Sequence, residues 1–252
     1  MVNQNKTIDS VQAGAIALSA QGKTTEASAR SLKREQDLPA VFKHMVARGP
    51  VVPVMVIKDM DQAIPLAEAL LEAGLTVLEI TLRTACALDA ISSLRKRFPE
   101  LFIGAGTLRQ ISQVSAVVDA GAQFAGSPGY DPELGETCRK HGLDLLPGIA
   151  SASELMQANR DGFYFVKLFP AEAIGGIRLI QSFASPFAET MFCPTGGIDV
   201  SKARDYLALS NVACVGGSWM IPATALAAGD WLLIRDLASQ AQALERAFTA
   251  QR

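Results

Sequence analysis

Residues 51–82 read VVPVMVIKDMDQAIPLAEALLEAGLTVLEITL, and this stretch decides the fold class. A short apolar run at 51–57 is followed by a longer amphipathic stretch at 61–72, and then by a second β-branched run at 77–82. Short apolar runs of this kind predict buried strands, and the amphipathic stretch between them predicts a helix. Strand, helix and strand in succession form the repeat of a parallel α/β fold.

The same alternation continues along the chain. Strands are predicted at 51–57, 77–82, 102–105, 123–126, 143–146, 163–169, 191–194 and 212–215. Helices are predicted at 61–72, 85–97, 110–120, 132–141, 152–158, 175–183 and 200–209, and from 222 onward into a terminal helix at 230–250. Eight such units predict an α/β fold of the closed (β/α)8 TIM-barrel type. An open doubly wound sheet is the alternative, but it would need a glycine-rich turn after the first strand, where Ile57-Lys58-Asp59 contains no glycine.

Residues 1–38 differ in composition from the rest of the chain, being rich in Ser, Thr, Gln and Ala. We expect an N-terminal extension there, partly helical or disordered, and a single barrel domain at 39–252. The extension lacks the basic start and continuous apolar segment of a secretory signal. No apolar run in the sequence is long enough to span a membrane. The expected location is therefore the cytoplasm, with no membrane partner.

Composition narrows the possible chemistry. Lys and Arg number 23 and Asp and Glu number 25, a net charge of −2, so no basic field would attract nucleic acid. The two histidines, His44 and His141, nearly exclude a histidine-built zinc site. The four cysteines form no CxxC pair, which favours reduced core thiols. Catalysis would then fall to lysine, carboxylates, hydroxyls or backbone groups.

Lys167 lies in the most aromatic run of the chain, at 163–170. Period-2 alternation places it on the same face as Phe163, Phe165 and Phe169, which predicts an apolar setting. Desolvation disfavours the charged form of a lysine, and the neutral amine is the form that attacks a ketone. The alternative is a lysine that reaches solvent or pairs with a carboxylate. Lys58, at the end of the first strand, is a rival amine.

Glu79 is a carboxylate inside an otherwise apolar strand. Alternation places Val77, Glu79, Thr81 and Arg83 on one face, which points into the predicted barrel. A carboxylate there can pass a proton in either direction, and Arg83 is suited to clamp a substrate carboxylate. The alternatives are a structural Glu79 paired with Arg83 or another cation, and a surface arginine at the start of the next helix.

Glycine pairs end the last two predicted strands, as Gly196-Gly197 and Gly216-Gly217-Ser218. Many barrels bind a phosphate at this place, with exposed backbone N–H groups as donors. Together, the two pairs predict phosphate binding, with the Ser218 hydroxyl as a further donor.

At these residues the sequence closely resembles the class I aldolases of 2-keto-3-deoxy-6-phosphogluconate (KDPG), which also act on 4-hydroxy-2-oxoglutarate (KHG). The resemblance runs from about Val51 to the terminal helix, and it implies the TIM-barrel fold. The matching motifs are VLEITLRT at 77–84, GAGT at 104–107, GAQF at 121–124, SPG at 127–129, LPG at 146–148, KLFPAE at 167–172, FCPTGGI at 192–198 and GGSW at 216–219.

The resemblance gives the candidate residues their roles. It implies that Lys167 forms the Schiff base, that Glu79 is the general acid and base, and that Arg83 and Thr107 bind the pyruvate end of the substrate. Pro128 and Thr195 are further candidate substrate contacts. The expected phosphate ligands are Gly196, Gly197, Gly216, Gly217 and Ser218. The resemblance also implies a homotrimer, and no metal ion or cofactor is expected.

The predicted function is that of an aldehyde-lyase of carbohydrate metabolism, in the Entner–Doudoroff pathway. It would cleave KDPG reversibly to pyruvate and glyceraldehyde 3-phosphate, and KHG to pyruvate and glyoxylate is a second candidate reaction. Three alternatives stay open: a phosphosugar isomerase or epimerase with Glu79 as base, an aldolase with a carboxylate-bound Mg²⁺, and a non-catalytic phosphometabolite-binding protein. The sequence does not separate KDPG, KHG and the C4 epimer as substrates.

Overall fold

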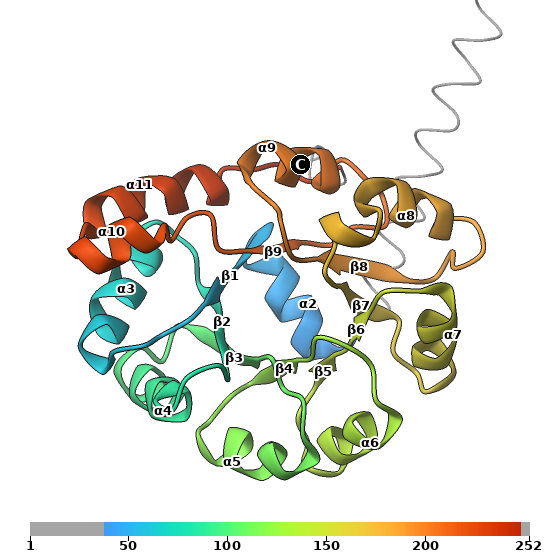
Figure 1. Cartoon of the computed structure of the whole chain (residues 1–252), viewed down its shortest axis with the longest axis horizontal. Coiled ribbons are helices and arrows are strands. Elements are labelled where there is room, and N and C mark those ends of the chain that lie inside the picture. The colour runs from blue at the N-terminus through green and yellow to red at the C-terminus, as the bar shows by residue number, and fades with distance from the viewer. Residues whose placement is uncertain (1–37, 248–252) are drawn as a thin grey trace, which may run out of the picture.

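The computed structural model describes residues 38–247 of the chain, and in it a ring of parallel strands is surrounded by helices (Figure 1). Apart from Leu38, the predicted extension at 1–38 lies outside the described residues, as does the end of the predicted helix at 230–250. Among the described residues, no helix has the length and apolar character to cross a membrane.

The strands form two parallel sheets. The larger has the order β5-β4-β3-β2-β1-β9, and the smaller has the order β6-β7-β8. Their bounds are β1 (Val51–Met55), β2 (Val77–Thr81), β3 (Phe102–Gly106), β4 (Phe124–Gly126), β5 (Leu145–Leu146), β6 (Gly148–Ile149), β7 (Phe165–Leu168), β8 (Met191–Pro194) and β9 (Val215–Gly217). The prediction of a parallel, curled α/β sheet is therefore confirmed.

Two short seams join the sheets into the ring of Figure 1. Pro147 alone separates β5 from β6, because a proline has no N–H to donate to a ladder. Between β8 and β9 there are two isolated parallel bridges, Phe192 with Val212 and Thr195 with Gly216. The predicted strand bounds are wrong at both seams. The strand predicted at 143–146 ends at Leu146 as β5, and β6 follows after Pro147. The strand predicted at 212–215 is found further along the chain as β9, which begins only at Val215 and pairs with β1.

The helices lie outside the ring, apart from α2. They are α2 (Ala40–Ala47), α3 (Met60–Glu72), α4 (Ala87–Arg97), α5 (Val114–Asp119), α6 (Pro132–Lys140), α7 (Ala152–Arg160), α8 (Gly176–Phe183), α9 (Val200–Leu207), α10 (Ala223–Ala228) and α11 (Trp231–Gln242). Short 3₁₀ turns, η1 (Ile111–Gln113) and η2 (Glu172–Ile174), precede α5 and α8. The C-terminal region is two helices because Gly229 takes a left-handed conformation, with φ 65°, and the predicted terminal helix ends early, at Gln242.

Aspartates begin several of these helices by accepting hydrogen bonds from backbone N–H groups. Asp59 caps α3, Asp131 caps α6 just before Pro132, and Asp199 caps α9. Each cap follows the carboxyl end of a strand, and these strand ends together form the end of the ring that we call its mouth. The cap therefore fixes where the connecting loop turns away from the mouth.

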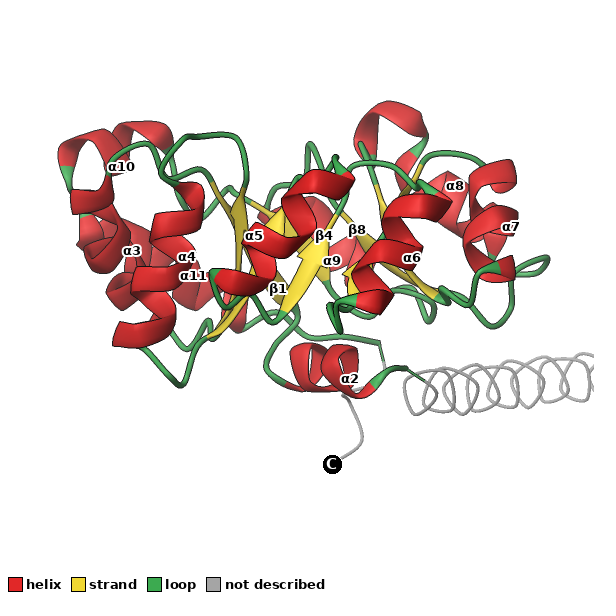
Figure 2. Cartoon of the chain, turned by 90° about the horizontal axis from the view of Figure 1, so that it is seen from below, coloured by secondary structure: helices red, strands yellow, loops and turns green. Residues whose placement is uncertain are grey.

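The buried residues form two apolar clusters. One lies between the strands and the outer helices. The other fills the amino-terminal end of the ring, where Phe42, Met45 and Val46 of α2 pack against the first inward residues of the strands, such as Val77 and Phe165. Figure 2 shows α2 below the strands, so α2 closes this end of the ring. We call this second cluster, with α2, the apolar plug. The sequence analysis did not predict α2, although its apolar residues have helical spacing.

Candidate active site

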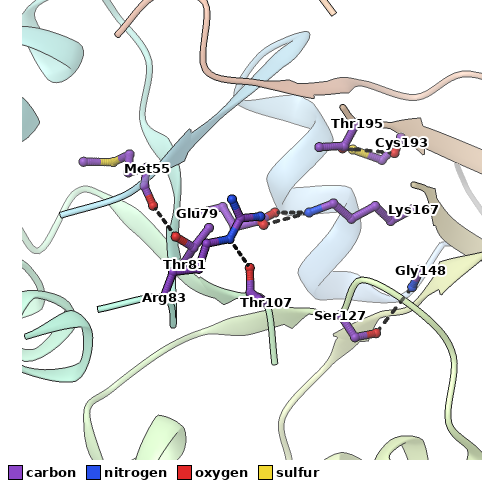
Figure 3. A network of polar contacts seen from close by, with 10 residues as sticks. All are labelled: Met55, Glu79, Thr81, Arg83, Thr107, Ser127, Gly148, Lys167, Cys193 and Thr195. Carbon is purple, nitrogen blue, oxygen red and sulfur yellow. Dashed lines mark hydrogen bonds and ion pairs between the residues drawn. The ribbon is translucent and has the colours of Figure 1, made fainter. Parts of the chain in front are cut away.

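Lys167 and Glu79 meet in the middle of the ring. The Lys167 Nζ atom donates to both carboxylate oxygens of Glu79, at 2.7 Å to Oε1 and 3.0 Å to Oε2. Lys167 extends from β7 and Glu79 from β2, on opposite sides of the interior (Figure 3). Their side chains are only 6% and 4% exposed. The predicted alternation is therefore right at both positions, and Glu79 pairs with Lys167 rather than with Arg83.

Neighbouring residues leave room for this pair and shield it. A side chain at Gly106 would collide with Glu79 Oε1, and one at Gly126 would touch the other oxygen. The centre of the Phe169 ring lies 6.0 Å from the Lys167 Nζ. A buried ion pair of this kind loses the hydration of two charges, so each partner depends on this direct contact for compensation.

Arg83 and Thr107 stand together at the mouth, above the end of β2 (Figure 3). The Arg83 Nε donates to Thr107 Oγ1 at 3.1 Å, which leaves the terminal nitrogens of the guanidinium to take a carboxylate. Thr107 has φ 60°, a left-handed conformation that is uncommon for a threonine. Strain of this kind is often found at functional sites, where surrounding structure holds it in place.

Pro128 lies in the loop after β4, beside the strand break at Pro147. The Ser127 Oγ donates to the Gly129 carbonyl at 2.7 Å and accepts from the Gly148 N–H at 3.3 Å. Gly148 has to be a glycine here, because a Cβ would lie 2.4 Å from the Pro128 carbonyl carbon. The sequence analysis did not single out Ser127, which is the residue that holds the Pro128 loop in place.

Thr195 is buried directly after the end of β8, where it forms an isolated bridge with Gly216. Its Oγ1 occupies the space that a side chain at Gly216 would need, so the end of β9 approaches it closely.

A hydrogen bond from Cys214 holds the pKa of the Cys193 thiol below its usual value, and the same contact raises the pKa of Cys214. All four cysteines are free thiols, three of them buried.

The turn at Gly196-Gly197 has its carbonyls turned toward the protein. Both glycines have positive φ, 106° and 76°. The carbonyls of Thr195 and Gly196 accept the N–H groups of Ala171 and Glu172, at 2.9 and 3.2 Å. Within residues 38–247, the N–H groups of Gly196 and Gly197 have no hydrogen-bond acceptor. Free N–H groups on successive residues of such a turn form an anion-binding concavity.

Ser218 follows β9, whose end pairs with Thr195 beside that turn, and it lines a cavity of about 440 Å³. The cavity lies between the end of β1 and the loop after β9, and Val54, Val56 and Lys58 also line it. Gly217 lies under the Trp219 ring, which approaches too closely for any side chain at that position. The predicted phosphate ligands thus lie at the ends of β8 and β9, on one side of the mouth.

Two further residues considered in the sequence analysis lie away from the buried pair. Lys58 is exposed and lines that cavity, away from the buried pair. Phe163 is not on the inner face with Lys167, because β7 begins only at Phe165, and it packs in the outer cluster. Among residues 38–247, no three His, Cys, Asp or Glu side chains are grouped so as to hold a metal ion.

Comparisons with known proteins show which family the chain is similar to. The family model "KDPG and KHG aldolase" matches residues 42–237. A KHG/KDPG aldolase of Escherichia coli (strain K12) is 49% identical over 197 residues, which is 78% of this chain and 92% of the relative.

Two solved structures are also similar. One is a KDPG aldolase from Legionella pneumophila, with pyruvate captured at low pH as a covalent carbinolamine intermediate. It has a TM-score of 0.77 and 46% identity, and the match covers 79% of this chain and 97% of that one. The other is the KDPG aldolase of Zymomonas mobilis ZM4 with 3-phosphoglycerate. It has a TM-score of 0.78 and 42% identity, and the match covers 83% and 98% of the two chains.

Proposed function

The chain belongs to the KDPG and KHG aldolase family, and on that premise we propose that Lys167 is the amine of a Schiff-base aldolase that cleaves KDPG to pyruvate and glyceraldehyde 3-phosphate. The observation that carries the proposal is the buried contact of 2.7 Å between the Lys167 Nζ and Glu79. A relative of this chain with pyruvate bound as a covalent carbinolamine supports the same chemistry.

The reaction begins with a proton transfer. Glu79 takes a proton from Lys167 across their hydrogen bond, which leaves a neutral amine to attack the C2 ketone of the substrate. The carbinolamine then loses water, with the proton supplied by Glu79, and a protonated imine remains. Transfer over one short hydrogen bond between buried groups needs no rearrangement of solvent.

Cleavage uses the imine as the electron sink. Glu79 accepts the proton of the C4 hydroxyl, the C3–C4 bond breaks, and its electron pair moves into the imine to give an enamine. Glyceraldehyde 3-phosphate leaves with its new aldehyde at the former C4. Protonation of the enamine at C3 and hydrolysis of the imine then release pyruvate and restore the free Lys167.

The mouth of the ring orients the substrate. Arg83 and Thr107 bind the carboxylate end, with Pro128 and Thr195 as further contacts. The phosphate binds to the N–H groups at the ends of β8 and β9, through Gly196, Gly197, Gly216, Gly217 and Ser218. Their contribution is to hold C2 and C4 near the buried pair, which lowers the entropic cost of reaction.

The proposal extends to the assembly and the fold. We count β5 and β6 as one strand broken at Pro147, which makes the ring an eight-stranded (β/α)8 barrel. The barrel domain would comprise residues 39–252 and follow an N-terminal extension at 1–38. The family resemblance adds a homotrimer in the cytoplasm, and light scattering in solution tests the trimer.

Release of pyruvate from KDPG, KHG and the C4 epimer of KDPG tests the function and its breadth. We expect cleavage of KDPG, unchanged in EDTA, and loss of cleavage in Lys167→Ala. An isomerase or epimerase would convert a phosphosugar without releasing pyruvate, and a binding protein would hold KDPG intact. A metal-dependent aldolase would lose activity in EDTA. Full turnover in the Lys167→Ala protein would contradict the assignment.

A further inference from the structure

Behind the Gly196-Gly197 turn lies a group of three side chains that the mechanism does not use. Glu172 lies between Tyr206 and Lys202: the Tyr206 hydroxyl donates to Glu172 Oε1 at 2.5 Å, and Lys202 Nζ lies 3.1 Å from Oε2. Lys202 Nζ also donates to the Gly197 carbonyl, at 3.0 Å. The three side chains belong to η2 and α9, so they link the loops after β7 and β8.

Together these contacts hold three successive carbonyls of the turn. The Thr195 and Gly196 carbonyls accept from the backbone N–H groups of Ala171 and Glu172, and the third, that of Gly197, accepts from the Lys202 side chain. In a trans peptide, the C=O and the following N–H point in opposite directions. Tying a carbonyl back to the protein therefore turns the next N–H outward, so Lys202 sets the direction of the Ile198 N–H.

Lys202 is itself fixed on two sides. The Asp199 carboxylate caps α9 by accepting from the Ser201 and Lys202 N–H groups, which places the first turn of the helix beside the glycine turn. The ion pair with Glu172 then directs the Lys202 stem toward Gly197. The Tyr206 hydrogen bond holds the pKa of Glu172 below its usual range, so the carboxylate that orients Lys202 stays charged.

We propose that Lys202 is a positioning residue for the phosphate end of the substrate: it tethers the Gly197 carbonyl so that the Ile198 N–H points at the phosphate beside the N–H groups of Gly196 and Gly197, and Glu172 and Tyr206 hold Lys202 in place. This inference rests on the proposed function. It adds to that function a side-chain tether that does not touch the reacting atoms.

The test is the affinity for inorganic phosphate, measured as competitive inhibition of KDPG cleavage. Lys202→Met keeps the aliphatic stem and removes the donor. We expect the inhibition constant of phosphate and the KM for KDPG to rise about tenfold, the size of change that loss of one charge-assisted hydrogen bond produces. Cleavage of the dephosphorylated analogue, 2-keto-3-deoxygluconate, should stay within about twofold. Lys202→Arg, which keeps donors at the same end, should restore most of the affinity.

Lys140→Met is the matched control, because Lys140 forms an exposed ion pair with Glu136 at 2.7 Å on α6. It should change neither constant. If Lys202→Met is stable by thermal melting and binds phosphate as the unaltered chain does, the tether is refuted.

Glu172→Gln distinguishes a tether from a direct contact by the sign of its effect. While Tyr206 holds Oε1, the new amide nitrogen faces the Lys202 ammonium, donor against donor, so the tether loosens and phosphate affinity should fall. If Lys202 acted only as a charge on the phosphate, removing the nearby negative charge of Glu172 would strengthen binding. Tighter phosphate binding in Glu172→Gln therefore overturns the proposal.

The unaltered chain provides the separate check on the proposed function. If it cleaves no KDPG, the proposed function fails. If it cleaves KDPG while the Lys202 and Glu172 variants bind phosphate normally, only the tether fails.

Discussion

The two ends of the ring interior are built from alternate residues of the same strands, yet their chemistry is opposite. On β7, Phe165 belongs to the apolar plug and Lys167 to the buried pair, and on β2, Val77 and Glu79 show the same contrast. Two residues of a strand span about 7 Å. A distance of two residues along each strand therefore separates side chains that stabilise the fold by packing from side chains that can react.

This contrast teaches that the plug and the pair have separate tasks. α2 closes the amino-terminal end with Phe42, Met45 and Val46, and none of these three side chains carries a group that can exchange a proton. The other end keeps space open with glycines such as Gly106 and Gly126 beside Glu79. Substitutions at one end should change stability, and those at the other should change turnover.

The largest effect is expected from Lys167→Met. Without the amine no imine forms, so kcat for pyruvate release should fall at least about 10⁴-fold. Lys58→Met is the matched control, because it removes the rival amine, which is exposed and lines the neighbouring cavity. It should keep turnover within about threefold. Equal losses in both variants would contradict the assignment of the reactive lysine.

Glu79→Gln should have the next largest effect. The amide cannot take or give a proton in the dehydration and cleavage steps, so kcat should fall about 10²- to 10⁴-fold. Glu136→Gln, at an exposed carboxylate that also pairs with a lysine, is the control. Activity close to that of the unaltered chain in Glu79→Gln would mean that another group moves the proton.

At the plugged end, Phe165→Leu should cost stability and leave turnover unchanged. Loss of part of a buried ring lowers the free energy of unfolding by about 1–2 kcal/mol, which thermal or urea unfolding measures. Below the melting range, kcat should stay within about threefold. A large loss of kcat in a fully folded Phe165→Leu protein would show that the two ends are not separate.

The smallest effect is a pH dependence at the mouth. The pKa of Glu172 is lowered in the folded protein, mainly by the Tyr206 hydrogen bond, so its stabilising contribution is present above the unfolded value of 4.5 and is lost as the pH falls below it. The difference in Tm between the unaltered chain and Glu172→Gln should therefore shrink on acidification. The corresponding difference for Phe165→Leu should not depend on pH. A Glu172→Gln difference that is constant from pH 7 to acid would contradict the pKa direction.

Much of this arrangement could be predicted because the signals are local. The alternation of apolar runs and amphipathic stretches predicted the order of strands and helices, and period 2 placed Lys167 and Glu79 inside. That the two touch depends on the tilt and register of β2 and β7 across the ring, which no local pattern contains.

The missed features depend on tertiary contacts. α2 has only eight residues, and a helix of that length is stable only where it packs, here on the plug. The shift of β9 follows from its pairing with β1 rather than from its own apolar residues. Lys202 and Tyr206 lie in an ordinary amphipathic helix, and their link to the Gly197 turn is visible only once α9 is placed beside it.

Reductive trapping of pyruvate tests the central claim most directly. Borohydride reduces an imine to a stable secondary amine, so incubation with pyruvate should inactivate the enzyme and leave a single modified peptide, with the adduct on Lys167. Lys167→Met should take up no pyruvate, and Lys58→Met should be labelled as fully as the unaltered chain. An adduct on another lysine, or active enzyme without any adduct, would contradict the account.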